Sequence, residues 1–356
     1  MTTKGPASLM VVAGGSGGHI YVAVSFCQEA CQRWGDAGEV TFVTQRDRQA
    51  LTDPLPPSCG VILVEAKRSL AGAARLFGEA WRLLGRLRPT WVVGFGGYMT
   101  VPFAVAAKMR GCRVMVHEQN VVLGRANRLL ALAADAVAVT FEETRRQAGP
   151  VLRRKLVVTR FPLRQSLTPL DAGAARRSFG LDEGRFTLLV LGGSQGARKL
   201  NEGVPGALAK SGIADRVQVI HLCGGGDSGQ LEERYAGLRI PCHVMKFLTE
   251  MERAYSAADL AVSRSGSGVL HELVHFGCPS ILVPYPHAAG HQLANARALA
   301  EQGAALLLEE SRLEAGALGQ LLRILVTDTV RRKTMATVAR RMRAEGAQVS
   351  PLELLC

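Results

Sequence analysis

The stretch that decides the fold is Leu9-Met10-Val11-Val12-Ala13-Gly14-Gly15-Ser16-Gly17-Gly18-His19. An uncharged apolar run of this length is typical of a strand that is buried on both faces. The glycines that follow let backbone N–H groups approach an anion closely, and a helix is expected over 22–33. His19 is the side chain of this turn that can exchange a proton near pH 7. The pattern predicts an α/β fold, although a single glycine turn is weak evidence for a ligand.

Three further glycine turns follow apolar runs in the same way. They are Gly94-Phe95-Gly96-Gly97-Tyr98, Gly192-Gly193-Ser194-Gln195-Gly196-Ala197 and Ser263-Arg264-Ser265-Gly266-Ser267-Gly268. Doubly wound folds bind ligands at the carboxyl ends of their strands, where such turns lie. Four turns at this kind of junction therefore indicate a cleft that binds phosphates.

Apolar strands alternate with helices along the whole chain, which predicts parallel sheets covered by helices on both faces. A polar segment after Pro162, over 165–185, interrupts the alternation. We therefore expect two Rossmann-like domains facing a central cleft, 1–163 and 164–356, the second ending in a basic tail helix. The expected strands are 9–13, 40–43, 61–64, 91–93, 114–117, 136–139 and 156–159 in the first domain, and 186–191, 217–222, 243–245, 260–262, 280–283 and 304–308 in the second.

The chain of 356 residues is basic, with a formal net charge of +13. This charge fits phosphorylated small molecules, an anionic membrane surface or nucleic acid. Nucleic acid is the weakest of these, because there is no zinc-finger spacing, RNA-binding signature or basic stripe with interleaved aromatic residues. The 8 cysteines are scattered without a CxxC pair, which favours small core residues in a reducing cytoplasm.

No stretch reads as a signal peptide, because the apolar run before Gly14 is short and lacks a cleavage site. The uncharged stretch 91–107 is interrupted by glycines and Pro102, so strand, loop and buried helix are expected there rather than a membrane span. The segment 67–88 mixes apolar residues with arginines. It is either an amphipathic cover helix or an interfacial membrane patch that includes Arg75, Leu76, Phe77 and Arg82.

Polar residues at strand ends are the remaining candidates for a site. His117-Glu118-Gln119-Asn120 closes an expected strand, with Asn120 as a helix cap the plainer alternative. Glu272 follows a glycine turn, where a carboxylate suits two vicinal hydroxyls such as those of ribose. Gln292 and Asn295 can recognise sugar hydroxyls. His287 and His291 lack acidic or thiol partners nearby, so we expect no metal site.

In their order, the glycine turns and His117-Glu118-Gln119-Asn120 resemble the MurG family of peptidoglycan glycosyltransferases over about 8–343. The resemblance implies a GT-B fold and metal-independent, inverting transfer of N-acetylglucosamine from UDP-N-acetylglucosamine to lipid I, giving lipid II. It implies no cofactor, a peripheral position on the cytoplasmic face of the bacterial inner membrane, and docking through the segment 67–88.

The resemblance also implies roles for individual residues, with His19 as the general base. The donor would be held by Ser16, Gly17, Gly18, Asn127, Arg164, Ser194 at the diphosphate, Leu248 beside the uracil, Ser267, Gly268, Val269, Leu270, His271, Glu272 on the ribose, and Gln292 with Asn295 behind it on the sugar. The acceptor would be bound by Gly14, Gly15, Gly96, Gly97, Tyr98, His117, Glu118 and Asn120.

The chain departs from the family pattern at several positions. Its last helix, which in the family crosses back to the first domain, is expected to be truncated or absent after Gly346. The other departures are Val22, Arg160-Phe161-Pro162 at the hinge, Ser267-Gly268-Val269, His271, and Ala289 with Gly290. Two alternatives follow. A non-catalytic membrane scaffold gains weight from the hinge and the tail. A nicotinamide-dependent dehydrogenase loses weight, because the strand ending at Gln45 is not followed by the acid that such enzymes use.

Overall fold

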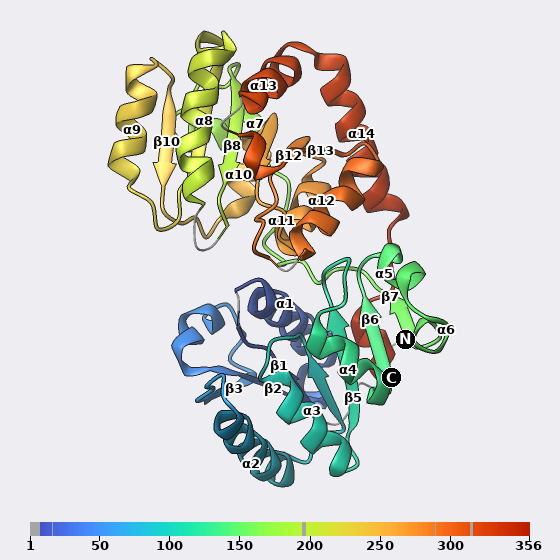
Figure 1. Ribbon diagram of the computed structural model, residues 1–356. Helices are drawn as coiled ribbons and strands as arrows, with labels where there is room; N and C mark the ends of the chain where they lie inside the picture. Colours follow the sequence, from blue (N-terminus) through green and yellow to red (C-terminus); the bar gives the residue numbers. More distant parts are fainter. Residues whose placement is uncertain (1–7, 16, 194–196, 289, 314–315) are drawn as a thin grey trace. The chain divides into compact units, whose positions relative to one another are not determined.

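The computed structural model describes residues 8–15, 17–193, 197–288, 290–313 and 316–356. It divides into two compact units, one of residues 1–164 with 347–356 and one of residues 165–346 (Figure 1). Each unit is a parallel sheet with helices packed on it, as the alternation of strands and helices predicts. Two such units are the components of a GT-B fold.

The first unit is built on a seven-stranded sheet in the order β3-β2-β1-β4-β5-β6-β7. Its strands are β1 Ser8–Val12, β2 Glu39–Gln45, β3 Cys59–Val64, β4 Trp91–Gly94, β5 Arg113–Glu118, β6 Ala136–Val139 and β7 Leu156–Val158. Its helices are α1 Gly17–Trp34, α2 Leu70–Leu87, α3 Thr100–Met109, α4 Arg125–Ala133, α5 Glu142–Gln147 and α6 Pro150–Arg153, with a C-terminal 3-10 turn η5 Pro351–Leu355. All seven expected strands are confirmed, within about two residues at each end.

Alternate residues of β1 enter two different cores, which explains why the whole strand is apolar. Leu9 and Val11 pack with Ile20 of α1 on one face of the sheet. Met10 and Val12 pack on the other face, with Phe103 of α3 and with α2 and α4. A parallel sheet with both faces covered requires this pattern.

The second unit is a six-stranded sheet in the order β10-β9-β8-β11-β12-β13. Its strands are β8 Phe186–Leu191, β9 Val217–Leu222, β10 Cys242–Met245, β11 Leu260–Ser263, β12 Ser280–Leu282 and β13 Ala305–Leu307, as expected from the sequence. Its helices are α7 Ala172–Arg177, α8 Arg198–Ser211, α9 Ser228–Gly237, α10 Met251–Ala257, α11 Ser267–Phe276, α12 His291–Glu301, α13 Ala317–Thr327 and α14 Thr329–Glu345.

No α-helix follows Gly346 in the described residues 347–356, as expected, but the end of the chain still returns to the first unit. Residues 347–356 belong to the first unit and not to the second. Leu352 and Leu355 lie in the same core as α1, and Arg160 donates its backbone N–H to Val349 O at 2.9 Å. Ser350 Oγ also donates to Glu29 Oε1 at 2.7 Å. The return is therefore made by the short turn η5 rather than by a long helix.

Candidate active site

The carboxyl ends of four adjacent strands, β2, β1, β4 and β5, form the candidate site of the first unit. Val12 of β1 pairs with Gly94 of β4, and Gly94 pairs with Val116 of β5, so the segments that follow these strands emerge side by side. This edge includes the point where the strand order reverses around β1, which is where doubly wound folds bind ligands.

Glycine is required in these turns because neighbouring backbone or side-chain atoms lie against it. A Cβ on Gly97 would lie 2.4 Å from Gly14 O, and a Cβ on Gly14 would lie 2.2 Å from the sulfur of Met99. Gly15, with φ +88°, has a backbone conformation that side chains rarely adopt. Ser16, one of the expected donor contacts, lies outside the described residues.

His19 lies in the first turn of α1, beside Gly96 and Asn127. Its Nδ1 is 3.2 Å from Gly14 O, and since a carbonyl can only accept, Nδ1 carries the proton. The lone pair is then on Nε2. A Cβ on Gly96 would lie 3.4 Å from Nε2 and 3.7 Å from Asn127 Nδ2, so the space over Gly96 is bordered by both side chains. The tautomer and the position suit a general base.

Glu118 accepts four hydrogen bonds from the loop between β5 and α4 and the start of α4. Its Oε1 accepts from the backbone and side-chain nitrogens of Asn120, both at 3.0 Å. Its Oε2 accepts from Gly124 N at 2.8 Å and Asn127 Nδ2 at 2.9 Å. Glu118 is 2% exposed, and Asn120 binds it rather than capping α4, which begins after Gly124. Its four hydrogen bonds give Glu118 a structural role in this loop, and its contact with the acceptor stays a prediction.

His117 and Tyr98 are two other expected acceptor contacts, and of these Tyr98 is half-buried. His117 is wholly buried and stacks on Phe95, with ring centroids 4.7 Å apart. Burial lowers the pKa of His117 to about 3. The Tyr98 hydroxyl donates to Ala66 O, and burial of Tyr98 raises its pKa. Asn127 keeps a group for a ligand, since its buried Oδ1 accepts no hydrogen bond from the described part of the chain.

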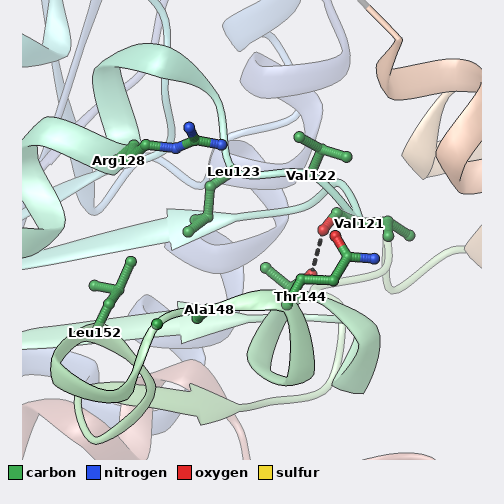
Figure 2. Close-up of a pocket in the computed structure, with 9 residues that line it drawn as sticks. Val121, Val122, Leu123, Arg128, Thr144, Ala148 and Leu152 are labelled. Carbon is green, nitrogen blue, oxygen red and sulfur yellow. Dashed lines mark hydrogen bonds between the residues drawn. The ribbon is translucent and has the colours of Figure 1, made fainter.

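The loop that Glu118 organises also lines a hollow of ≈ 340 Å³ (Figure 2). Leu123 of the loop and Leu152 of α6 point toward each other across it, and Thr144 Oγ1 donates to Val121 O at 2.8 Å in its wall. Arg128 is the one cation among its lining residues. The hollow suits an apolar group next to an anionic or carbonyl group. The sequence patterns did not indicate it, because α4, α5, α6 and the loop contribute to it together.

Gln45 is a site residue that the sequence analysis missed. It ends β2 next to β1, and its Oε1 accepts from Gly15 N at 2.8 Å. Its Nε2 donates to the Tyr98 hydroxyl at 3.0 Å. The sequence showed only that no acid stands at this strand end, and not that an amide there joins two glycine turns.

In the second unit, the carboxylate of Glu272 accepts a hydrogen bond from Tyr255 of α10. The Tyr255 hydroxyl donates to Glu272 Oε2 at 2.6 Å, and Tyr255 is 2% exposed and stacks on Phe276 at 5.2 Å between ring centroids. Glu272 is half-buried on α11, past the glycine turn that ends β11. Its carboxylate is therefore oriented before any ligand arrives. Tyr255 was not singled out from the sequence, because nothing in its helix marks it.

Gln292 and Asn295 of α12 bind the turn after β11. Gln292 Oε1 accepts from Tyr285 N at 2.9 Å and Ser265 N at 3.3 Å, so its Nε2 is the group it can present to a ligand. Asn295 is wholly buried and donates to Ser265 O at 3.1 Å. Gln292 is half-buried, and the contact of Gln292 and Asn295 with the donor sugar stays a prediction.

The turn itself is braced by Arg264, which the sequence analysis also passed over. Arg264 is 7% exposed and donates to Val283 O at 3.1 Å and to the carboxylate of Glu310. It fixes the loop after β12 against the end of β11.

The other expected donor contacts lie on several elements, with Gly17 and Gly18 at the start of α1. Ser267, Gly268 and Val269 form the first turn of α11, and His271 lies half-buried beyond it. The side chain of Leu270 is wholly buried, and its N–H is donated to Gly266 O. Leu248 is half-buried after β10, and Arg164 is the last residue of the first segment of unit 1. Ser194 lies outside the described residues.

Within the basic segment 67–88, residues Leu70–Leu87 form helix α2. Arg75 and Arg82 are exposed, and Phe77 is half-buried and stacks on Trp81 with centroids 6.1 Å apart. Leu76 corrects the expected patch, because it is wholly buried against the sheet and offers no surface to a membrane. Among the described residues, no helix has the length and apolar character to cross a bilayer, and no cluster of three or more His, Cys, Asp or Glu side chains is suited to a metal.

Both halves of the chain match domains of one glycosyltransferase family. The profile of the glycosyltransferase family 28 N-terminal domain matches residues 63–139, and that of the family 28 C-terminal domain matches residues 187–349. The chain is 35% identical, over 98% of each chain, to the UDP-N-acetylglucosamine--N-acetylmuramyl-(pentapeptide) pyrophosphoryl-undecaprenol N-acetylglucosamine transferase of Stutzerimonas stutzeri. It is 36% identical to the protein of the same name from Pseudomonas fluorescens, over 96% of each.

Solved structures show the same relationship. The crystal structure of Acinetobacter baumannii MurG superimposes with a TM-score of 0.75 at 26% identity, covering 98% of this chain and 97% of that one. Phytolacca americana UGT2 superimposes with a TM-score of 0.72 at 12% identity, covering 98% and 97%. The second similarity is one of fold alone.

Proposed function

The chain belongs to the MurG family of glycosyltransferases, and on this premise we propose that it transfers N-acetylglucosamine from UDP-N-acetylglucosamine to lipid I, forming lipid II. Lipid I is undecaprenyl-diphospho-N-acetylmuramoyl-pentapeptide. The observation that carries the mechanism is the His19 imidazole, with Nδ1–H bound to Gly14 O and the Nε2 lone pair beside Gly96.

His19 is the general base of this proposal. The muramoyl hydroxyl loses its proton to Nε2 as its oxygen attacks the anomeric carbon of the donor. The bond from that carbon to the UDP oxygen breaks in the same displacement, which inverts the configuration. The hydrogen bond to Gly14 O stabilises the imidazolium that forms, because a charged donor strengthens it. Asn127 Oδ1 is the group we assign to an N–H or O–H of the substrate.

The second unit binds the donor in this proposal. Glu272 accepts hydrogen bonds from the ribose hydroxyls, and Gln292 Nε2 donates to a sugar oxygen. The first turn of α11 directs backbone N–H groups and the positive end of the helix dipole toward the diphosphate, where negative charge gathers as UDP leaves. We expect this charge stabilisation to suffice without an added metal, as the family resemblance implies.

We further propose a peripheral position on the cytoplasmic face of the inner membrane. The exposed arginines of α2 would bind anionic headgroups there, with apolar side chains of the same helix between them. The scaffold alternative loses one of its two supports, because the tail does return to the first unit.

The experiment that tests this function is transfer by the purified chain. Labelled UDP-N-acetylglucosamine is supplied with lipid I in mixed anionic vesicles, and lipid II is identified by mass. UDP-glucose serves as the matched donor. The proposal requires lipid II with the first donor and far less product with the second, and donor binding without any product would favour the scaffold.

A further inference from the structure

We propose that Gln45 is a positioning residue that sets the tautomer of His19 by holding the Gly14–Gly15 peptide in one orientation. The inference rests on the proposed function, in which Nε2 of His19 is the base. It concerns a residue outside the glycine turns, at the end of the neighbouring strand β2.

The argument begins with a single peptide plane. Gly14 C=O and Gly15 N–H belong to the same rigid peptide unit, so they point in opposite directions. The C=O accepts from His19 Nδ1 at 3.2 Å, and the N–H donates to Gln45 Oε1 at 2.8 Å. The side chains of His19 and Gln45 therefore bind the two ends of one group.

A peptide between two glycines is otherwise easily turned over. Neither residue has a Cβ to oppose rotation, and Gly15 already has φ +88°. If the plane turned over, its N–H would face His19 Nδ1. An N–H there stabilises the tautomer in which Nδ1 accepts and Nε2 carries the proton, and that tautomer cannot act as a base at Nε2.

The orientation of the Gln45 amide is itself determined. Gly15 N–H can only donate, so the Gln45 atom facing it is Oε1, and Nε2 is left to donate to the Tyr98 hydroxyl at 3.0 Å. Tyr98 then donates its own proton to Ala66 O. Burial raises the pKa of Tyr98, and the hydroxyl therefore remains a donor over the working pH range. Each hydrogen bond in this chain has one possible direction. His19 donates to the Gly14–Gly15 peptide, the peptide donates to Gln45, and Gln45 donates to Tyr98.

The test measures the tautomer without substrate, so that it stands apart from the proposed function. Nitrogen-15 spectra of the imidazole, assigned by the loss of the signal in His19→Gln, report which ring nitrogen is protonated above its pKa. Wild type should show Nδ1–H. Gln45→Ala should shift the tautomer ratio at least about tenfold toward Nε2–H, since the plane is no longer held.

Three variants sharpen the result. Gln45→Met keeps the volume and removes the acceptor. It should shift the tautomer as Gln45→Ala does, and it replaces Gln45→Ala if the alanine variant does not fold. Gln45→Glu keeps an acceptor for Gly15 N–H, and should retain the wild-type tautomer. Gln28→Ala is the matched control, because Gln28 donates to Pro54 O at 2.7 Å in the same unit but outside this chain of bonds.

Transfer kinetics then follow the tautomer. Gln45→Ala should lower kcat about 10- to 100-fold with little change in KM for UDP-N-acetylglucosamine, because the base and not the donor site is affected. If both Gln45→Ala and Gln45→Met keep the wild-type tautomer, the inference is overturned, whatever their transfer activity. Absence of transfer in wild type, with the tautomer shift present, would overturn the proposed function instead.

Discussion

Gly96 lies where any side chain would meet His19. A Cβ at Gly96 would be 3.4 Å from Nε2 and 3.5 Å from Cδ2 of the imidazole, and the backbone there has φ +96°. The glycine therefore does two things, since it relieves backbone strain and leaves space for the acceptor hydroxyl beside the base.

We predict that Gly96→Ala lowers kcat/KM for transfer at least about 100-fold, because the methyl fills the space in which the hydroxyl must approach Nε2. The backbone strain alone should cost about 1–2 kcal/mol of unfolding free energy. Gly111→Ala is the control, since Gly111 has φ +77° and open space around its Cβ position. It should lose similar stability and keep its activity. Equal activity losses in both variants would mean that strain, not crowding, is the cause.

On the donor side, Tyr255→Phe should weaken binding of UDP-N-acetylglucosamine about 5- to 10-fold, because a hydrogen bond to a carboxylate is lost and Glu272 is no longer fixed. The phenyl ring preserves the stacking on Phe276. Isothermal calorimetry measures the affinity, and Tyr235→Phe, which removes a buried hydroxyl bonded to His221 in the same unit, is the control. Unchanged affinity in Tyr255→Phe would remove Tyr255 from the ribose site.

Two buried histidines predict how stability depends on pH. Burial lowers the pKa of His117 to about 3 and that of His221 to about 4, from an ordinary value of 6.5. The unfolded chain takes up these protons near pH 6.5, whereas the folded chain does not until pH 3–4. Each histidine should therefore reduce the unfolding free energy by up to about 1.4 kcal/mol per pH unit as the pH falls below 6.5.

Urea titrations of the free energy of unfolding between pH 7 and pH 4.5 check this expectation. Because His117 lies in one unit and His221 in the other, both units should weaken. His117→Phe should flatten the pH dependence of the first unit only. A slope that is unchanged in this variant would contradict the assignment.

For the membrane patch, we predict that Arg75→Glu with Arg82→Glu weakens binding to anionic vesicles by about 1 kcal/mol or more per residue, and less so at high salt. Arg341→Glu, with the same charge change per residue, is the control for each single patch variant, and Arg341 is exposed on α14 of the second unit. Sedimentation with phosphatidylglycerol vesicles measures the bound fraction. If Arg341→Glu is as harmful as the patch variants, net charge rather than α2 determines binding.

The strands and the residues at their ends were predictable because apolar runs and glycine turns are local signals. Ser8–Val12 and Leu260–Ser263 are examples, and both end at a site. His19, Glu272 and Gln292 were singled out as candidates for a related reason, since each lies within the first two turns of a helix that follows a strand.

Other features depend on contacts between distant residues and were not predictable. The sequence suggested Glu118 as a ligand contact but could not show the four hydrogen bonds that it accepts within its own loop. Leu76 shares a helix with exposed arginines but lies on the inner face, a matter of helix rotation that the mixed sequence left open. Gln45 matters only because β2 lies next to β1. The return of η5 involves contacts such as Ser350 with Glu29, which are 321 residues apart.

The most direct test of His19 as a metal-independent base compares wild type with His19→Ala in transfer of labelled N-acetylglucosamine to a lipid I analogue, with EDTA present throughout. The account predicts full wild-type turnover in EDTA and a loss of about 100- to 10,000-fold in the variant, with donor affinity unchanged. Turnover in His19→Ala within a few-fold of wild type, or loss of wild-type activity in EDTA, would contradict it.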